Sequence, residues 1–194
     1  EHFHFLQEIV NIYRSISFLD NPSYEESNLN QIAQEISDLY RRASSRKIIW
    51  EQILCEEPII CTMETRLIKL AIFNLLANSY EAVKENQSEE QPSTISITTG
   101  TDHSWNWVQI TDNGNGLRDH NGNLLPTDAI SQIFEYGYTT KKKKNGEGLG
   151  LSWVKTIVTK FHHGSIKAEH VLEGGTRFTI YLPSDGSVTP DGEI

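Results

Sequence analysis

Apolar residues recur at helical spacing in three stretches of the N-terminal half of the chain. Near the start they lie four, three, four and three residues apart, the spacing of a helix-bundle seam, at Phe5, Ile9, Ile12, Ile16 and Leu19. Residues 20–23 break this helix, and an amphipathic helix is expected at residues 29–43. A third stretch, residues 64–85, is apolar on most sides and predicts a buried helix.

A periodicity of two marks the strands that follow. Their apolar positions alternate with polar or aromatic ones and are Ile95 and Ile97, Val108 and Ile110, Ile166 and Ala168, and Phe178, Ile180 and Leu182. Short strands are also expected at residues 47–54 and 59–61, and a helical stretch at residues 152–160. Since one face of the strands is apolar and the other open, helices should cover one side only. The sequence therefore predicts an α+β fold, a two-layer α/β sandwich with a mixed, mostly antiparallel sheet.

Trp105 and Trp107 fall on the open face of this sheet. Two indoles there either mark a surface for a partner or stack across neighbouring strands, and stacking is the commoner arrangement.

Composition narrows the possible functions. The 194 residues include 17 Lys and Arg against 26 Asp and Glu, a net charge of −9, so a nucleic-acid partner is not expected. The two cysteines, Cys55 and Cys61, lack metal-ligand spacing and indicate a reduced, cytoplasmic setting. No apolar run approaches membrane-spanning length. Because the chain begins within a helix and without methionine, we expect a fragment of a longer protein, which could itself be membrane-anchored.

Two carboxamides stand out in the buried helix. Asn74 and Asn78 are four residues apart and share one helix face, where an amide pair needs a polar partner. Amide oxygens are suitable ligands for Mg²⁺, which takes its other ligands from water and phosphates. The pair is either a magnesium site or a hydrogen-bonded pair within the core.

Two glycine-bearing segments complete a candidate nucleotide site. In the first, Asp112 ends the strand that carries Val108 and Ile110, and Gly114 and Gly116 follow it. A carboxylate there can accept a hydrogen bond from an exocyclic amine. The second segment, residues 146–151, opens a helical stretch and offers free backbone N–H groups to phosphate oxygens.

Together these segments closely resemble the ATP-binding domain of the GHKL superfamily, and best of all its sensor histidine kinases. Residues 74–82 resemble the asparagine box, 112–116 the first glycine box, 133–141 the phenylalanine box, 146–151 the second glycine box and 174–178 the last glycine motif. The resemblance implies a Bergerat-type fold, a catalytic ATP-binding domain at residues 28–183 and the end of a dimerisation-bundle helix at residues 1–20. Residues 184–194 are rich in Gly, Ser, Pro and Asp, which predicts a disordered tail.

The resemblance also implies roles for individual residues. Asn74 and Asn78 would be catalytic, with Asn78, assisted by Asn74, holding Mg²⁺ on the phosphates of ATP. Thr176 would support the contact between Asp112 and adenine, and Lys141 would bind phosphate. The full set of implied nucleotide contacts is Asp112, Gly114, Gly116, Thr140, Lys141, Gly146, Gly148, Leu149, Gly150, Leu151 and Thr176.

Position 74 separates the branches of the superfamily. Gyrases and mismatch-repair ATPases carry a glutamate there that activates water, whereas an asparagine cannot act as a base. The resemblance therefore implies transfer of the γ-phosphoryl group to a histidine of the protein's own dimerisation domain. Further implications are relay to the receiver domain of a response regulator and a homodimeric parent protein. A non-catalytic ATP-binding regulatory module and a GHKL ATPase remain as alternatives.

Two questions stay open at this point. Glu81 stands where many sensor kinases carry a lysine, and it is either a solvated helix residue or a functional one. None of the seven histidines has the expected context of a phosphoacceptor. His2 and His4 are each followed by phenylalanine instead of an acidic residue. The acceptor is therefore expected upstream of this chain.

Overall fold

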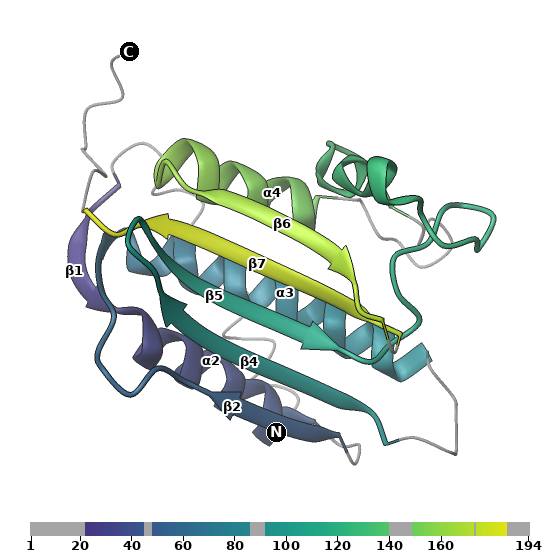
Figure 1. Ribbon diagram of the computed structural model, residues 1–194, viewed down its shortest axis with the longest axis horizontal. Helices are drawn as coiled ribbons and strands as arrows, with labels where there is room; N and C mark the ends of the chain where they lie inside the picture. The colour runs from purple at the N-terminus through teal and green to yellow at the C-terminus, as the bar shows by residue number, and fades with distance from the viewer. Residues whose placement is uncertain (1–21, 45–47, 86–91, 140–148, 173, 186–194) are drawn as a thin grey trace.

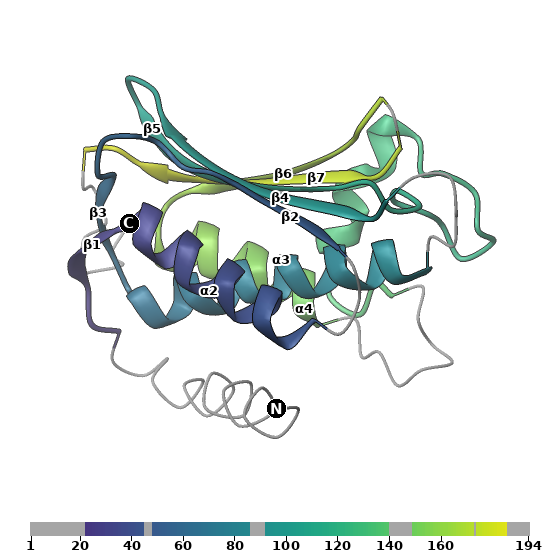
Figure 2. The ribbon, with the colours of Figure 1, turned by 90° about the horizontal axis from the view of Figure 1, so that it is seen from below.

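The computed structural model describes residues 22–44, 48–85, 92–139, 149–172 and 174–185, which fold into two layers. One layer is a five-stranded sheet with the order β2-β4-β5-β7-β6, and helices lie against one of its faces (Figures 1 and 2). β2 pairs with β4 in parallel, and the remaining three pairs are antiparallel. The α+β prediction is confirmed. The strands of this sheet are β2 (Ile49–Ile53), β4 (Thr94–Thr101), β5 (Trp105–Asp112), β6 (Ser165–His170) and β7 (Thr176–Pro183).

The helix layer consists of α2 (Leu29–Ala43), α3 (Thr65–Glu85) and α4 (Gly150–Thr156) (Figure 2). α2 begins after Asn28, whose side chain accepts a hydrogen bond from the Asn30 N–H. α3 lies between α2 and α4 under the sheet and is buried on several sides, as its sequence predicted. Its fully buried apolar residues are Ile68, Ala71, Ile72, Leu75 and Leu76.

The expected helical stretch at residues 152–160 is present but changes geometry along its length. It is α-helical in α4 and continues as a π-helical turn, η4 (Ile157–Phe161). In η4 the Ile157 carbonyl contacts Nδ1 of His162 at 2.8 Å, so a side chain occupies this backbone acceptor. A further 3-10 helix, η2 (Thr127–Phe134), was not predicted and packs against α4.

A second, two-stranded sheet joins β1 (Glu25–Asn28) to β3 (Ile60–Met63). β3 lies close to the short strand expected at residues 59–61. β1 was not predicted, because its four residues, EESN, have no apolar alternation. Residues 1–20 and 186–194, for which a bundle helix and most of a disordered tail are expected, lie outside the described residues.

The open face of the main sheet carries the two tryptophans. Trp107 lies opposite Gly100 on β4, and a Cβ atom on Gly100 would overlap the indole ring. Trp105 meets Tyr181 of β7 edge to face, with ring centroids 6.4 Å apart. Stacking across strands, the favoured interpretation, is thus seen for Trp105, whereas Trp107 packs over a glycine. Within the described ranges, no helix combines the length and the apolar character needed to cross a bilayer.

Candidate functional site

The carboxylate of Asp112 lies at the end of β5, between the sheet and α3. It belongs to the same strand face as Val108 and Ile110, and only 3% of the residue is exposed. Oδ1 accepts hydrogen bonds from the backbone N–H groups of Gly114 (2.9 Å) and Thr176 (3.3 Å). Oδ2 accepts one from the Ser79 hydroxyl at 2.8 Å. Asp112 therefore lies on the helix-covered side of the sheet.

Asp112 is a buried acid supported by neutral donors. Burial raises the pKa of Asp112 to about 6, although the hydrogen bonds from Gly114, Ser79 and Thr176 act in the opposite direction. An ionised carboxylate has about four lone-pair positions. Since three donors approach Asp112, about one position is left for a further donor.

Two glycines let the backbone close around this carboxylate. Gly175 has φ +98°, and a Cβ atom there would overlap the Asp112 carbonyl group. A Cβ atom on Gly114 would lie 2.7 Å from Cβ of Ala82 in α3. Both positions therefore exclude larger residues, and the corner between β5, β7 and α3 is tightly packed.

Asn74 and Asn78 lie on α3, one helical turn apart. Nδ2 of Asn74 donates to the Leu70 carbonyl at 2.9 Å. Its Oδ1 faces α4, since a Cβ atom placed on Gly150 would be 3.2 Å from it. The Asn78 side chain is half-buried, and no described residue forms a hydrogen bond with it. The two carboxamides therefore differ, since Asn74 bonds the backbone of its own helix and Asn78 does not, and the magnesium site remains a prediction.

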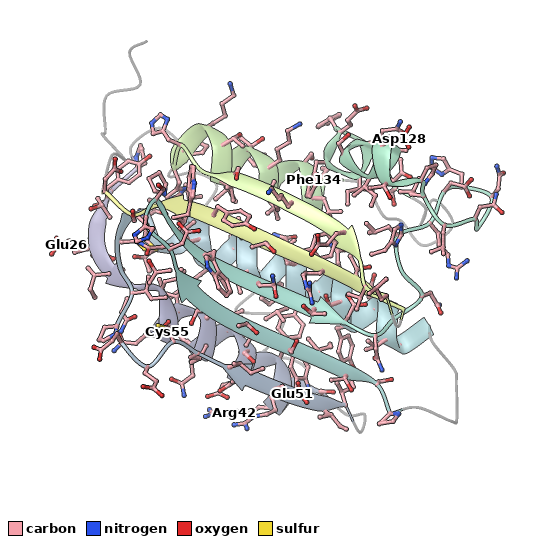
Figure 3. All side chains as sticks on the ribbon, in the orientation of Figure 1. Glu26, Arg42, Glu51, Cys55, Asp128 and Phe134 are labelled. Atoms are coloured by element: carbon pink, nitrogen blue, oxygen red, sulfur yellow. The ribbon has the colours of Figure 1, made fainter. Side chains whose placement is uncertain are left out.

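α3 thus links the two parts of the predicted site. Its Ser79 contacts Asp112, and the Oδ1 atom of its Asn74 faces Gly150 at the start of α4. Leu149, Gly150 and Leu151 form this start, and the buried Phe134 of η2 lies beside it (Figure 3). Four further predicted contacts lie outside the described residues, namely Thr140, Lys141, Gly146 and Gly148.

Gly116 lies apart from the carboxylate, in the loop that follows β5. It has φ +72°, and a Cβ atom there would lie 3.1 Å from Leu124 and 3.4 Å from Nδ1 of His170. Nε2 of His170 is 2.8 Å from the Leu125 carbonyl, which fastens this loop to β6. Gly116 therefore shapes the loop beside the site.

Ser79 is the side chain of the site that sequence reasoning missed. It is fully buried and contacts a residue 33 positions away in the sequence. The only available signal was a polar residue in an otherwise apolar helical segment, and many serines in helices meet that description. Among the described residues, no group of three or more His, Cys, Asp or Glu side chains could hold a metal ion.

The geometry agrees with comparisons to known proteins. Residues 63–186 match the family model for the "Histidine kinase-, DNA gyrase B-, and HSP90-like ATPase". The chain belongs to this family. The matched region contains α3, Asp112 and α4, and so contains every described residue of the site.

Relatives within this ATPase family are sensor kinases. Sporulation kinase B of Bacillus subtilis is 28% identical over 92% of this chain and 38% of its own length. Sensor protein RprX of Bacteroides fragilis is 32% identical over 65% of this chain and 22% of its own length. The chain therefore spans well under half the length of these relatives.

A solved structure supports the same branch of the ATPase family. The catalytic domain of histidine kinase ThkA superimposes with a TM-score of 0.68 at 26% identity, over 84% of this chain and 98% of that domain. The resemblance to the catalytic ATP-binding domain of a sensor histidine kinase is confirmed.

Proposed function

We propose that this chain binds ATP with Mg²⁺ and transfers the γ-phosphoryl group to a histidine on a dimerisation domain. The observation that carries the proposal is the pair of unfilled polar groups along α3. Asp112 is buried with about one acceptor position left, and the Asn78 carboxamide has no hydrogen bond to any described residue. Both groups can therefore accept a polar ligand on the helix-covered side of the sheet.

Asp112 would bind the base. Its remaining lone pair can accept a hydrogen bond from the exocyclic amine of adenine, and the hydrogen bonds from Gly114, Ser79 and Thr176 fix its orientation. Thr176 contributes through its backbone N–H.

Asn78 and Asn74 would hold the metal. Both present carboxamides along one face of α3, and the Asn74 oxygen already faces the start of α4. Two neutral oxygen ligands fit Mg²⁺, which keeps several waters and takes phosphate oxygens as further ligands. When bound, the ion neutralises charge on the phosphates.

The start of α4 would bind the phosphates. Gly150 and Leu151 lie in the first turn of α4, where backbone N–H groups lack intrahelical partners. We extend the phosphate site to Thr140, Lys141, Gly146 and Gly148 on the sequence resemblance alone.

Asn74 favours transfer over hydrolysis. Its Nδ2 is a hydrogen-bond donor to Leu70, and a carboxamide cannot take a proton from water at neutral pH. The γ-phosphoryl group of bound ATP would therefore wait for an acceptor held in line by docking of the two domains.

We place the acceptor histidine outside the described part of the chain. Both ring nitrogens of His162 are engaged, by the Glu64 N–H at 3.0 Å and the Ile157 carbonyl at 2.8 Å, so this buried residue is a poor acceptor. We extend a homodimeric parent protein to this chain on the sequence resemblance alone. ThkA, a structural neighbour, has been crystallised with the response regulator protein TrrA, which supports a receiver domain as the next partner.

The test combines the chain with γ-labelled ATP, Mg²⁺ and a separately prepared dimerisation domain. We expect acid-labile label on the dimerisation domain and little label or free phosphate with the chain alone. Asn78→Ala, with its weakened Mg-ATP binding, serves as the control and should transfer less label than wild type at the same ATP concentration. Brisk release of phosphate by the chain alone would favour the ATPase alternative. ATP binding without transfer to any dimerisation domain would favour a regulatory module.

A further inference from the structure

We propose that Ser79 is a specificity-determining residue, whose hydroxyl keeps Asp112 an oriented, acceptor-only partner for adenine and thereby excludes guanine. This inference rests on the proposed nucleotide site. Ser79 touches Asp112 and would not touch the nucleotide, so it acts by positioning the Asp112 carboxylate.

Ser79 is the only side-chain donor to Asp112 among the described residues. The other two donors, Gly114 and Thr176, use backbone N–H groups, and both approach Oδ1. The Ser79 hydroxyl alone approaches Oδ2, at 2.8 Å. This hydrogen bond therefore holds the second oxygen of the carboxylate in place. It also fixes the direction in which the remaining lone pair can accept a hydrogen bond from a ligand.

The protonation state of Asp112 decides which base it can accept. Adenine presents an amine, a donor, where guanine presents a carbonyl, an acceptor. An ionised carboxylate only accepts, so it pairs with the amine and repels the carbonyl, whereas a protonated carboxyl group can also donate.

Ser79 favours the ionised form. Asp112 is surrounded by the Ser79 hydroxyl from α3, the Gly114 N–H from its own loop and the Thr176 N–H from β7. Within the described part of the chain no charged side chain shifts the pKa of Asp112, so hydrogen bonds alone oppose the effect of burial. Removing the hydroxyl should leave a larger fraction of Asp112 protonated and free to turn.

The experiment compares wild type with Ser79→Ala, using ATP and GTP as probes in titration calorimetry between pH 5.5 and 8.5. At neutral pH we expect ATP affinity to fall by about tenfold, as for one lost hydrogen bond to a charged group. The preference for ATP over GTP should fall with it and should recover in part at the alkaline end. The carboxyl carbon of Asp112, followed by NMR, should titrate at higher pH in the variant.

Ser37→Ala is the matched control. Ser37 is also fully buried in a helix, α2, and its hydroxyl accepts a hydrogen bond from Gln52 Nε2 at 3.2 Å. This variant should retain the wild-type ratio of ATP to GTP affinity. If Ser79→Ala does not fold, Ser79→Cys replaces it, because a thiol keeps the size but donates weakly.

Three results overturn the inference. A folded Ser79 variant with the wild-type nucleotide preference and the wild-type titration of Asp112 overturns it and leaves the proposed function intact. An equal loss of preference in Ser37→Ala overturns it as a non-specific effect. A wild-type chain that binds no adenine nucleotide overturns the proposed function and this inference together.

Discussion

Two buried acids, Glu64 and Asp112, lie near different parts of α3 and differ in how their oxygens are used. Each is 3% exposed. Glu64 precedes the helix, and its Oε1 is 2.6 Å from Nε of Arg66 while its Oε2 accepts from the Leu67 N–H at 2.8 Å. Among the described residues, Asp112 contacts only neutral donors and no cation. The first acid is paired with a cation of the protein, whereas the second is the one that we propose to bind adenine.

The residues around the two acids also differ in how they are bonded. The Glu64 N–H donates to His162 Nε2, and His162 lies edge to face against Tyr24, which donates to the Phe161 carbonyl at 2.7 Å. These contacts join β1, the start of α3 and the end of η4. Around Asp112 all three hydrogen-bond donors are neutral, and the Asn78 carboxamide has no hydrogen bond to a described residue. We therefore infer that the contacts at the start of α3 serve stability, whereas the proposed binding residues lie further along the helix.

The largest expected effect is a loss of stability on substitution of His162, which bonds the backbone of Glu64. His162→Ala leaves the Glu64 N–H and the Ile157 carbonyl without their side-chain partner and opens a cavity, so the free energy of unfolding should fall by roughly 3 kcal/mol or more. Urea denaturation measures this. His163→Ala, at the exposed neighbouring position with φ +50°, should change stability by about 1 kcal/mol at most, because alanine would keep the same backbone conformation. Equal midpoints for the two variants would contradict the structural role of His162.

Asp112→Asn should have the opposite effect to His162→Ala and increase the free energy of unfolding at neutral pH. Burial raises the pKa of Asp112 to about 6 in the folded state, above its pKa in the unfolded chain. Asp112 therefore makes its full contribution to stability below the unfolded-state pKa, and this contribution declines as the pH rises through about 6. Asparagine does not titrate, so the variant should become more stable than wild type as the pH rises from about 4 to about 6. The difference should reach about 3 kcal/mol at most and then level off. Thermal unfolding across this range and up to about pH 8 measures it, and a constant difference would refute the raised pKa.

Binding by the same variant should fall for both nucleotides. The amide introduced at position 112 would direct a donor at the amine of adenine or lose its hydrogen bond from Ser79, so ATP and ADP affinity should drop together by about 1 to 3 kcal/mol. Calorimetry distinguishes this from a phosphate role for Asp112, in which ADP would be retained.

Asn78→Ala should weaken binding without weakening the fold. Loss of one metal ligand is expected to reduce Mg-ATP affinity by about tenfold, or about 1.4 kcal/mol. Stability should not fall, because no described residue bonds the Asn78 side chain and alanine is the better helix former. Nucleotide binding in the presence of a magnesium chelator is the control and should be equal in both proteins. Unchanged Mg-ATP affinity in the folded variant would remove Asn78 from the metal site.

The sequence located the residues of the proposed binding site better than it located the buried polar contacts around Glu64 and Asp112. Asp112, Asn74 and Asn78 could be placed because strand and helix periodicities fix the face on which each residue lies. Ser79 and His162 could not, because their partners lie 33 and 98 residues away and depend on how the layers dock. β1 lacked any periodic signal. Local patterns locate elements and faces, whereas buried polar partnerships follow from tertiary packing.

The smallest expected effect comes from making the same acid-to-amide change at the structural acid. In Glu64→Gln, the amide either faces Nε of Arg66 with its own donor or turns a donor towards the Leu67 N–H, so one hydrogen bond is lost in each orientation. Because the Arg66 side chain is 41% exposed and water can replace part of the interaction, we expect a loss of only about 1 kcal/mol. Nucleotide affinity should not change. Urea denaturation at neutral pH of this variant beside Asp112→Asn gives the comparison its clearest form, since one substitution should lower the midpoint and the other raise it. Shifts of the same sign would show that the two acids are supported alike, and the division of α3 into a structural and a binding part would then be wrong.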